Sequence, residues 1–248
     1  PWIGHVAGQF GGMSYEELVE GGVLDGDGWP LRIPPELGSI GTLVLTDMPE
    51  AAVSLRGRYR VEFDGSGIVE ISGRAQNVRY GKGEVTFDYE PGPGLVEIRI
   101  QRTAPSDPVR NITVIKEDNL ARYAAGERFN PDWIERIHGF KALRFMDWME
   151  TNNSTLSDWT ARPMPDDFTY ALQGVPIEVQ VALANGLAVD PWFNVPHLAD
   201  DAFVRAFAEY VKINLDPKLE VYVEFSNEVW NWQFNQALWA DEQALARW

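Results

Sequence analysis

The stretch VYVEFSNEVWNWQF at residues 221–234 carries the residue types best suited to chemistry. A strand-like apolar run leads directly into Ser226-Asn227-Glu228, and α/β folds place reactive groups at the carboxyl ends of such strands. Partial desolvation beside tryptophan rings favours the protonated form of a carboxylic acid, which is the form that a general acid requires. The same residues also fit a plain strand-to-helix turn, because Asn and Glu are favoured near helix N-termini.

Tryptophan side chains accompany this stretch and point to a sugar-binding surface. Eight of the ten tryptophans lie after residue 118, and several follow expected strands, which favours a cleft. Aromatic faces stack on the apolar faces of pyranose rings, and Asn227 can donate a hydrogen bond to a sugar hydroxyl. Trp192, Trp230 and Trp232 are therefore candidate stacking platforms, although any one of them taken singly is more often a packing residue.

The segment EFSNE at residues 224–228 resembles the Asn-Glu pair that ends the fourth strand of clan A glycoside hydrolases, which are retaining glycosidases on (β/α)8 barrels. The wider resemblance is to secreted bacterial proteins related to cellulases, and it rests on the runs FNPDWIERI, LRFMDWMETNNS, DPWFNVPHLADD and VYVEFSNEVWNWQF. The resemblance implies that Glu228 is the acid/base and that Asn227 binds the sugar 2-hydroxyl. It also implies a secreted or periplasmic protein.

The same resemblance implies roles for other residues of the second half. Arg144 matches an arginine at the end of the clan's second strand that orients the nucleophile, and the alternative is an ion pair with a neighbour such as Asp147. Trp192, Trp230 and His197 would contact the substrate, although His197 fits a hydrogen-bonded loop position equally well. The implied substrate is a polysaccharide or oligosaccharide, such as cellulose or a related β-glucan, and neither a cofactor nor a metal is implied.

The catalytic nucleophile cannot be assigned in this sequence. A retaining glycosidase needs two carboxyl groups about 5 Å apart, and in the clan the second one lies on strand seven. Only 20 residues follow Glu228 (248 − 228), so we expect a chain truncated after strand four. Asp147 and Asp190 are the candidates within the chain, and a homodimer of two half-barrels would supply the missing strands. The alternative function is a non-catalytic glycan-binding or structural fragment.

The pattern of the chain changes near residue 118. Residues 1–118 alternate apolar and polar side chains between turns, among which DGSG at 64–67 predicts a β-hairpin, and they predict an antiparallel β-sandwich-like domain. Residues 119–248 predict an α/β domain, with strands at 141–148, 175–185 and 218–228 and an amphipathic helix at 200–215. Since a complete (β/α)8 barrel needs about 250 residues, these 130 residues (248 − 118) predict a partial barrel of about four units.

Composition excludes several classes of partner. The 248 residues include 21 Lys and Arg and 37 Asp and Glu, and the resulting net charge of −16 disfavours nucleic acids and anionic membranes. No apolar run approaches the roughly 20 residues of a membrane span. The chain has no Cys and its three His residues are widely spaced, so the sequence contains neither a disulfide nor a His/Cys metal motif.

Overall fold

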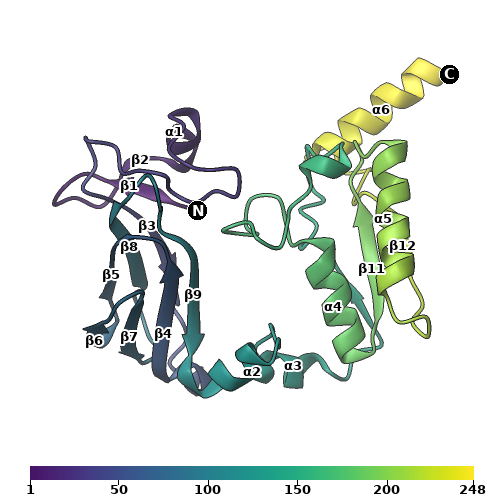
Figure 1. Cartoon of the computed structure of the whole chain (residues 1–248). Helices are drawn as coiled ribbons and strands as arrows, with labels where there is room; N and C mark the ends of the chain where they lie inside the picture. The colour runs from purple at the N-terminus through teal and green to yellow at the C-terminus, as the bar shows by residue number, and fades with distance from the viewer. The chain divides into compact units, whose positions relative to one another are not determined.

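The computed structural model describes residues 1–248, which form two compact units, Pro1–Arg128 and Phe129–Trp248 (Figure 1). The change of sequence pattern near residue 118 falls within the 3-10 helix η2 (Glu117–Asn119), which is followed by the short helix α2 (Leu120–Ala124). Each unit has sheets of its own.

The first unit is built from nine strands. They are β1 (Ile3–His5), β2 (Gly12–Met13), β3 (Ser39–Val44), β4 (Gly57–Asp64), β5 (Gly67–Gly73), β6 (Gln76–Tyr80), β7 (Glu84–Tyr89), β8 (Val96–Thr103) and β9 (Arg110–Lys116). They form two antiparallel sheets, of order β2-β1-β3-β8-β5 and β6-β7-β4-β9. Alternation buries one face of each sheet, including Val69 and Ile98 in the first and Val61 and Phe87 in the second. The connections contain helix α1 (Tyr15–Glu20) and the 3-10 helix η1 (Val53–Leu55).

The DGSG sequence at 64–67 does not form the hairpin expected there. It carries the chain from β4 in the four-stranded sheet to β5 in the five-stranded sheet. Gly65 has a φ of +88°, and a Cβ added to it would lie 2.1 Å from the carbonyl oxygen of Pro108. The Ser66 N–H donates to the Asp107 carbonyl at 2.8 Å. The turn residues were therefore recognised correctly, but the strands that they join pair with other partners, which is a non-local property.

We expect Gly65→Ala to lower the free energy of unfolding of the first unit by about 1–3 kcal/mol. Both the positive φ and the nearby Pro108 oxygen oppose a side chain at this position. Gly26→Ala is the matched control, because a Cβ on Gly26 would meet no atom within 4 Å. Denaturant unfolding of both variants measures the difference, and equal losses in the two would contradict the explanation.

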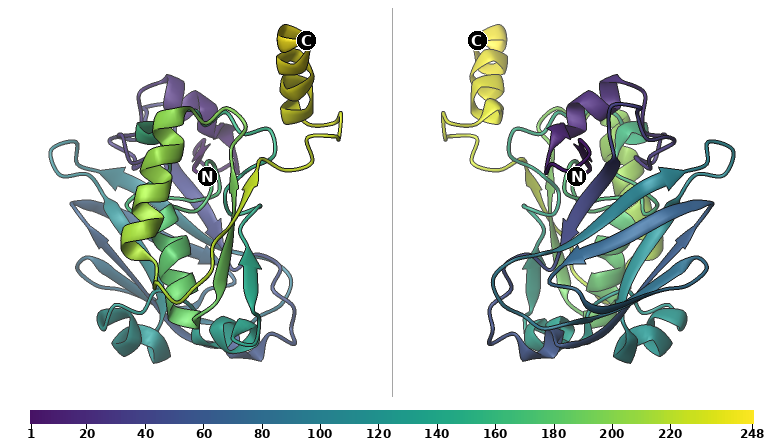
Figure 2. Two further views of the ribbon diagram at one scale, coloured as in Figure 1. Left: turned by 90° about the vertical axis from the view of Figure 1, so that its right-hand side faces the viewer. Right: turned by 90° about the vertical axis from the view of Figure 1, so that its left-hand side faces the viewer.

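The second unit is built on a parallel sheet of three strands, β10 (Ala142–Arg144), β11 (Asp190–Val195) and β12 (Tyr222–Phe225), in that order. Its helices are α3 (Pro131–Ile137), the 3-10 helix η3 (Trp159–Ala161), α4 (Ile177–Leu187), α5 (Asp201–Asn214) and α6 (Asn235–Arg247). Helices α4 and α5 pack on the same face of the sheet, because Phe193 of β11 lies in one buried cluster with Val181 of α4 and Phe207 of α5. Helix α6 stands away from them (Figure 2).

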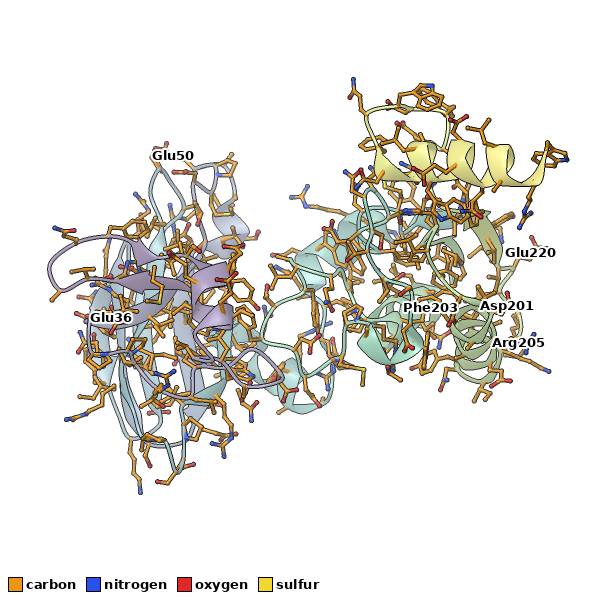
Figure 3. The ribbon with its side chains drawn as sticks, turned by 90° about the horizontal axis from the view of Figure 1, so that it is seen from above. Glu36, Glu50, Asp201, Phe203, Arg205 and Glu220 are labelled. Atoms are coloured by element: carbon orange, nitrogen blue, oxygen red, sulfur yellow. The ribbon has the colours of Figure 1, made fainter.

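The helix expected at 200–215 is confirmed as α5. Asp200 caps it, with a side-chain oxygen that accepts from the Phe203 N–H at 2.6 Å. The spacing of the apolar residues buries Phe203, Phe207 and Val211 on one side. Figure 3 shows Phe203 and the exposed Arg205 on this helix, on different sides of it. The helical period of the sequence was therefore sufficient to predict both the element and its buried face.

The run expected as a strand at 175–185 is instead the helix α4. Its β-branched residues resemble a strand, but Ile177, Val181 and Ala184 recur at helical spacing and all three are buried. Periodicity alone does not separate a short buried strand from a buried helix. The strand of this region is β11, which begins shortly after the helix ends.

The expected fold class, a β-sandwich-like domain followed by a partial (β/α) barrel, is wrong. The chain has three open sheets, most of its strands are antiparallel, and only three strands are parallel. Strands β10 and β12 each pair with a single neighbour, so no barrel closes within the chain. Val223 and Phe225 on the edge strand β12 are 65% and 55% exposed. Closure depends on pairings across the whole chain, which a local alternation of helix and strand does not determine.

Candidate functional site

Four polar side chains converge on the face of the parallel sheet that α4 and α5 leave uncovered. Arg144 on β10 lies beside Trp192 on β11, and Asn194 on β11 lies beside Glu224 on β12. Trp192 and Asn194 flank the buried Phe193, so alternation turns them to the opposite face from the core. Three neighbouring strands thus bring together a guanidinium, an indole, an amide and a carboxylate.

Glu224 is the centre of this cluster, although the sequence did not single it out. Its Oε2 accepts hydrogen bonds from Arg144 Nη2 at 2.8 Å and Nε at 3.1 Å, from Trp192 Nε1 at 3.0 Å and from Asn194 Nδ2 at 2.8 Å. Burial acts to raise the pKa of Glu224, but the hydrogen bonds from Arg144 and Asn194 together outweigh it and the pKa is lowered. The group is therefore a carboxylate at neutral pH. The only indication of Glu224 as a site residue in the sequence is that a charged residue occurs within an otherwise apolar strand.

The lowered pKa makes the stabilising effect of Glu224 depend on pH. A carboxyl whose pKa is depressed by folding stabilises the folded state above its ordinary value of 4.5, and this stabilisation is lost as pH falls through the lowered value. We expect Glu224→Gln to destabilise the second unit at pH 7 and to have progressively less effect below pH 4.5. Urea unfolding of both proteins over this pH range measures the difference. A difference that stays constant with pH would contradict the expectation.

Asn227 lies two residues after the end of β12, and both ends of its side chain are hydrogen-bonded within the protein. Its Oδ1 accepts from Arg144 Nη2 at 2.8 Å, and its Nδ2 donates to Asn152 Oδ1 at 2.9 Å. Gln236 at the start of α6 is fully buried, and its Nε2 donates to Asn152 Oδ1 and to the Asn227 carbonyl, each at 2.8 Å. Sequence reasoning missed Asn152 and Gln236 as site residues, because only the fold brings these separate polar residues together.

Glu228 lies in a turn of unusual backbone conformation. Ser226 has a φ of +55° and Glu228 a φ of +43°, a left-handed region that residues other than glycine seldom occupy. The Ser226 N–H donates to the Val195 carbonyl at 2.8 Å, and Asn194 Nδ2 donates to the Ser226 carbonyl at 2.9 Å, which holds the turn against β11. The Glu228 side chain is half-buried, and its Oε2 accepts from Asn231 Nδ2 at 2.8 Å.

The three remaining residues expected to contact a substrate lie in different surroundings. Trp192 is 37% exposed, and the guanidinium carbon of Arg144 lies 5.4 Å from its ring centre. Trp230 is 72% exposed. His197 is buried with its ring centre 5.7 Å from that of Trp239, and burial lowers the pKa of His197, so its ring is neutral. Of the three, Trp192 belongs to the Arg144 cluster.

Asp190 lies at the opposite end of the sheet from Glu228. It begins β11 in register with Ala142, the first residue of β10. Its Oδ2 lies 2.7 Å from Lys141 Nζ and its Oδ1 accepts from the Glu220 N–H at 2.9 Å. The interaction with Lys141 lowers the pKa of Asp190. Asp190 therefore links the amino ends of the strands and is not the second carboxyl group of a site at Glu228.

Comparisons with protein-family models, with curated proteins and with solved structures found no match. No group of three or more His, Cys, Asp or Glu side chains is arranged to hold a metal ion. No helix has both the length and the hydropathy that a bilayer crossing requires.

The groups that the site offers for chemistry are an ionised carboxylate, a fixed guanidinium, exposed indole rings and a carboxyl group on a constrained turn.

Proposed function

We propose that this chain binds β-glycans along the carboxyl ends of β10, β11 and β12, and that Glu228 is the acid that begins hydrolysis of the glycosidic bond. The exposed indole rings of Trp192 and Trp230 provide stacking surfaces for pyranose rings. Arg144 provides hydrogen-bond donors for sugar hydroxyls and is held in place by Glu224. A polymeric substrate of this kind fits a protein that acts outside the cytoplasm.

In the proposed reaction Glu228 donates its proton to the glycosidic oxygen while the bond from that oxygen to the anomeric carbon breaks. The leaving sugar departs as an alcohol. The other sugar is left as an oxocarbenium ion, whose anomeric carbon takes the oxygen of a water molecule, and the proton that this water releases returns to the Glu228 carboxylate. Glu224 is a positioning residue in this scheme, because its Oε2 is occupied by donors from Arg144, Trp192 and Asn194.

The backbone at Ser226 and Glu228 is the observation that carries the proposal. Each left-handed residue other than glycine costs about 1–3 kcal/mol and persists only where its surroundings enforce it. At Ser226 the Val195 carbonyl and the Asn194 amide enforce it, and at Glu228 the backbone and side chain of Asn231 donate to the carbonyl and to Oε2. Nine residues other than glycine have a positive φ in this chain, and two of them, Ser226 and Glu228, lie two residues apart in this turn. Such constrained backbone is typical of a residue whose side chain must be aimed.

Glycan binding without hydrolysis is the second candidate, and the hydrogen bonding of Asn227 favours it. Both polar groups of the Asn227 side chain are used within the protein, by Arg144 and by Asn152. Asn227 is also only 6% exposed, so the second N–H and the second lone pair of its amide are shielded from a sugar 2-hydroxyl in this arrangement. The exposed faces of Trp192 and Trp230 remain open to a glycan in either case.

Sugar release from β-glucans, xylans and mannans by the 248-residue chain tests the two candidates, with binding to the same polymers measured in parallel. Release together with binding supports the hydrolase. Binding without release supports the second candidate and overturns the first. If the chain neither binds nor cleaves any of these polymers, both are overturned.

A further inference from the structure

A second polar cluster belongs to the first unit alone, on the face of its five-stranded sheet opposite Val96, Ile98 and Ile100. Glu97 and Arg99 project from the same side of β8, with Ser72 of β5 beside Glu97 and Gly41 of β3 beside Arg99. The imidazole of His5 on β1 reaches across Gly41, where an added Cβ would lie 2.9 Å from His5 Nε2. A glycine at this position thus allows a histidine to meet a carboxylate two strands away.

The carboxylate of this cluster is deeply buried and incompletely hydrogen-bonded. Glu97 is 6% exposed and His5 is 2% exposed. Oε2 of Glu97 lies 3.0 Å from Arg99 Nε and accepts from Ser72 Oγ at 3.0 Å. Oε1 lies 3.2 Å from His5 Nε2 without the alignment of a hydrogen bond, so this buried oxygen has no hydrogen-bond partner. A buried carboxylate oxygen in that state is costly to the protein and is available as an acceptor for a ligand.

The cluster carries more negative than positive charge. The Gly11 N–H donates to His5 Nδ1 at 2.8 Å, so Nδ1 is an acceptor and the proton of the neutral ring is on Nε2. Burial lowers the pKa of His5 and outweighs the opposing effect of Glu97. Glu97 and Arg99 then neutralise one another, and Glu70, 4.0 Å from Arg99 Nε, adds negative charge beside them. The cluster therefore disfavours an anionic ligand.

The cluster opens into a cavity of about 460 Å³, a volume in the range of small-molecule sites. Ser39 and Gln101 add further polar groups to its lining. Phe10, on the loop that follows β1, also lines the cavity, is 65% exposed, and has its ring centre 4.8 Å from that of His5. The cavity thus combines a buried acceptor, several donors and one open aromatic ring.

We propose that this cavity binds a neutral saccharide. A neutral sugar ring presents hydroxyl groups that donate and accept together with an apolar face, which match Glu97, Arg99 and Phe10. An anion would meet Glu97 and Glu70, and a purely apolar ligand would leave the Glu97 oxygen without a partner. The site uses residues of the first unit only, so its occupancy does not depend on hydrolysis at Glu228.

Calorimetric titration of the full chain with cellotetraose, xylotetraose and mannotetraose tests the proposal. We expect at least one of them to bind, and Phe10→Ala to weaken that binding by about tenfold or more, which an aromatic contact of about 1.4 kcal/mol provides. Phe140→Ala is the matched control, because Phe140 is 60% exposed in the second unit. Repeating the titration with Trp192→Ala distinguishes this site from the one at Glu228. Binding in the cavity should be unchanged by Trp192→Ala, because Trp192 is not among the residues that line it.

Glu97→Gln is the second variant, and its thermal unfolding shows whether it folds. If it folds, it should also weaken binding, because an amide oxygen is a poorer acceptor than a carboxylate oxygen. The proposal is overturned if none of the three sugars binds, if binding survives Phe10→Ala unchanged, or if digalacturonate binds more tightly than the neutral sugars.

Discussion

Replacing Glu228 by glutamine is expected to lower the rate of sugar release by about 10²–10⁴-fold, the usual contribution of a general acid. The glutamine side chain has the same shape and can still accept the hydrogen bond from Asn231 Nδ2. It has no proton to give to the glycosidic oxygen. Glycan binding and thermal stability should therefore stay close to those of the wild type, while kcat on the glycan that the wild-type chain cleaves falls.

Two comparisons make this test specific. Glu209→Gln, an exposed change on α5, should release sugar at the wild-type rate. An aryl glycoside whose leaving group needs no protonation should be affected much less by Glu228→Gln than a natural glycan is. Losses of equal size on the two substrates would show that Glu228 does not act as the acid, even if it matters for activity.

Phe193→Ala is expected to lower the free energy of unfolding of the second unit by about 3–5 kcal/mol, the usual cost of emptying a buried aromatic site. Phe193 is 0% exposed, its ring centre lies 5.7 Å from that of Phe145, and it meets Phe207 edge-on at 5.2 Å. It is the residue at which the sheet, the loop after β10 and helix α5 meet. A loss of that size is a large fraction of the stability of a small domain.

The distribution of tryptophan provides the measurement. Eight of the ten tryptophans belong to Phe129–Trp248, so fluorescence during urea unfolding reports mainly on the second unit. Val204→Ala is the control, because Val204 is 44% exposed on α5 and its truncation should change stability by less than about 0.5 kcal/mol. A cost below about 1 kcal/mol for Phe193→Ala would contradict the central place of this residue in the core.

The parts of the fold that are encoded locally could be predicted, and those that depend on distant partners could not. Helix α5 was predictable, because Phe203, Phe207 and Val211 repeat at the helical period. Helix α4 was mistaken for a strand, because its apolar run is short enough to satisfy either period. The sheet order was not accessible, because the partner of each strand is chosen among residues far along the chain.

The candidate site shows the same division. The position after a strand pointed to Asn227 and the family resemblance pointed to Arg144, and a hydrogen bond of 2.8 Å joins them. One alternative considered for Arg144 was an ion pair with a neighbouring carboxylate, for which Asp147 was the example. An ion pair does form, but with Glu224, 80 residues away along the chain. Pairings of that range need the parallel register of β10, β11 and β12, which no local pattern contains.

The exposed edge strand β12 also determines how concentrated solutions of this chain behave. An edge strand with unpaired backbone groups and exposed apolar side chains is a template for strand addition by another copy. Near neutral pH the formal charge of −16 keeps copies apart by mutual repulsion. That repulsion is screened by salt and vanishes near the isoelectric point of about 4.5. Electrostatic repulsion therefore keeps concentrated solutions of the chain clear. We expect turbidity on acidification or at high ionic strength, at temperatures at which the chain is still folded.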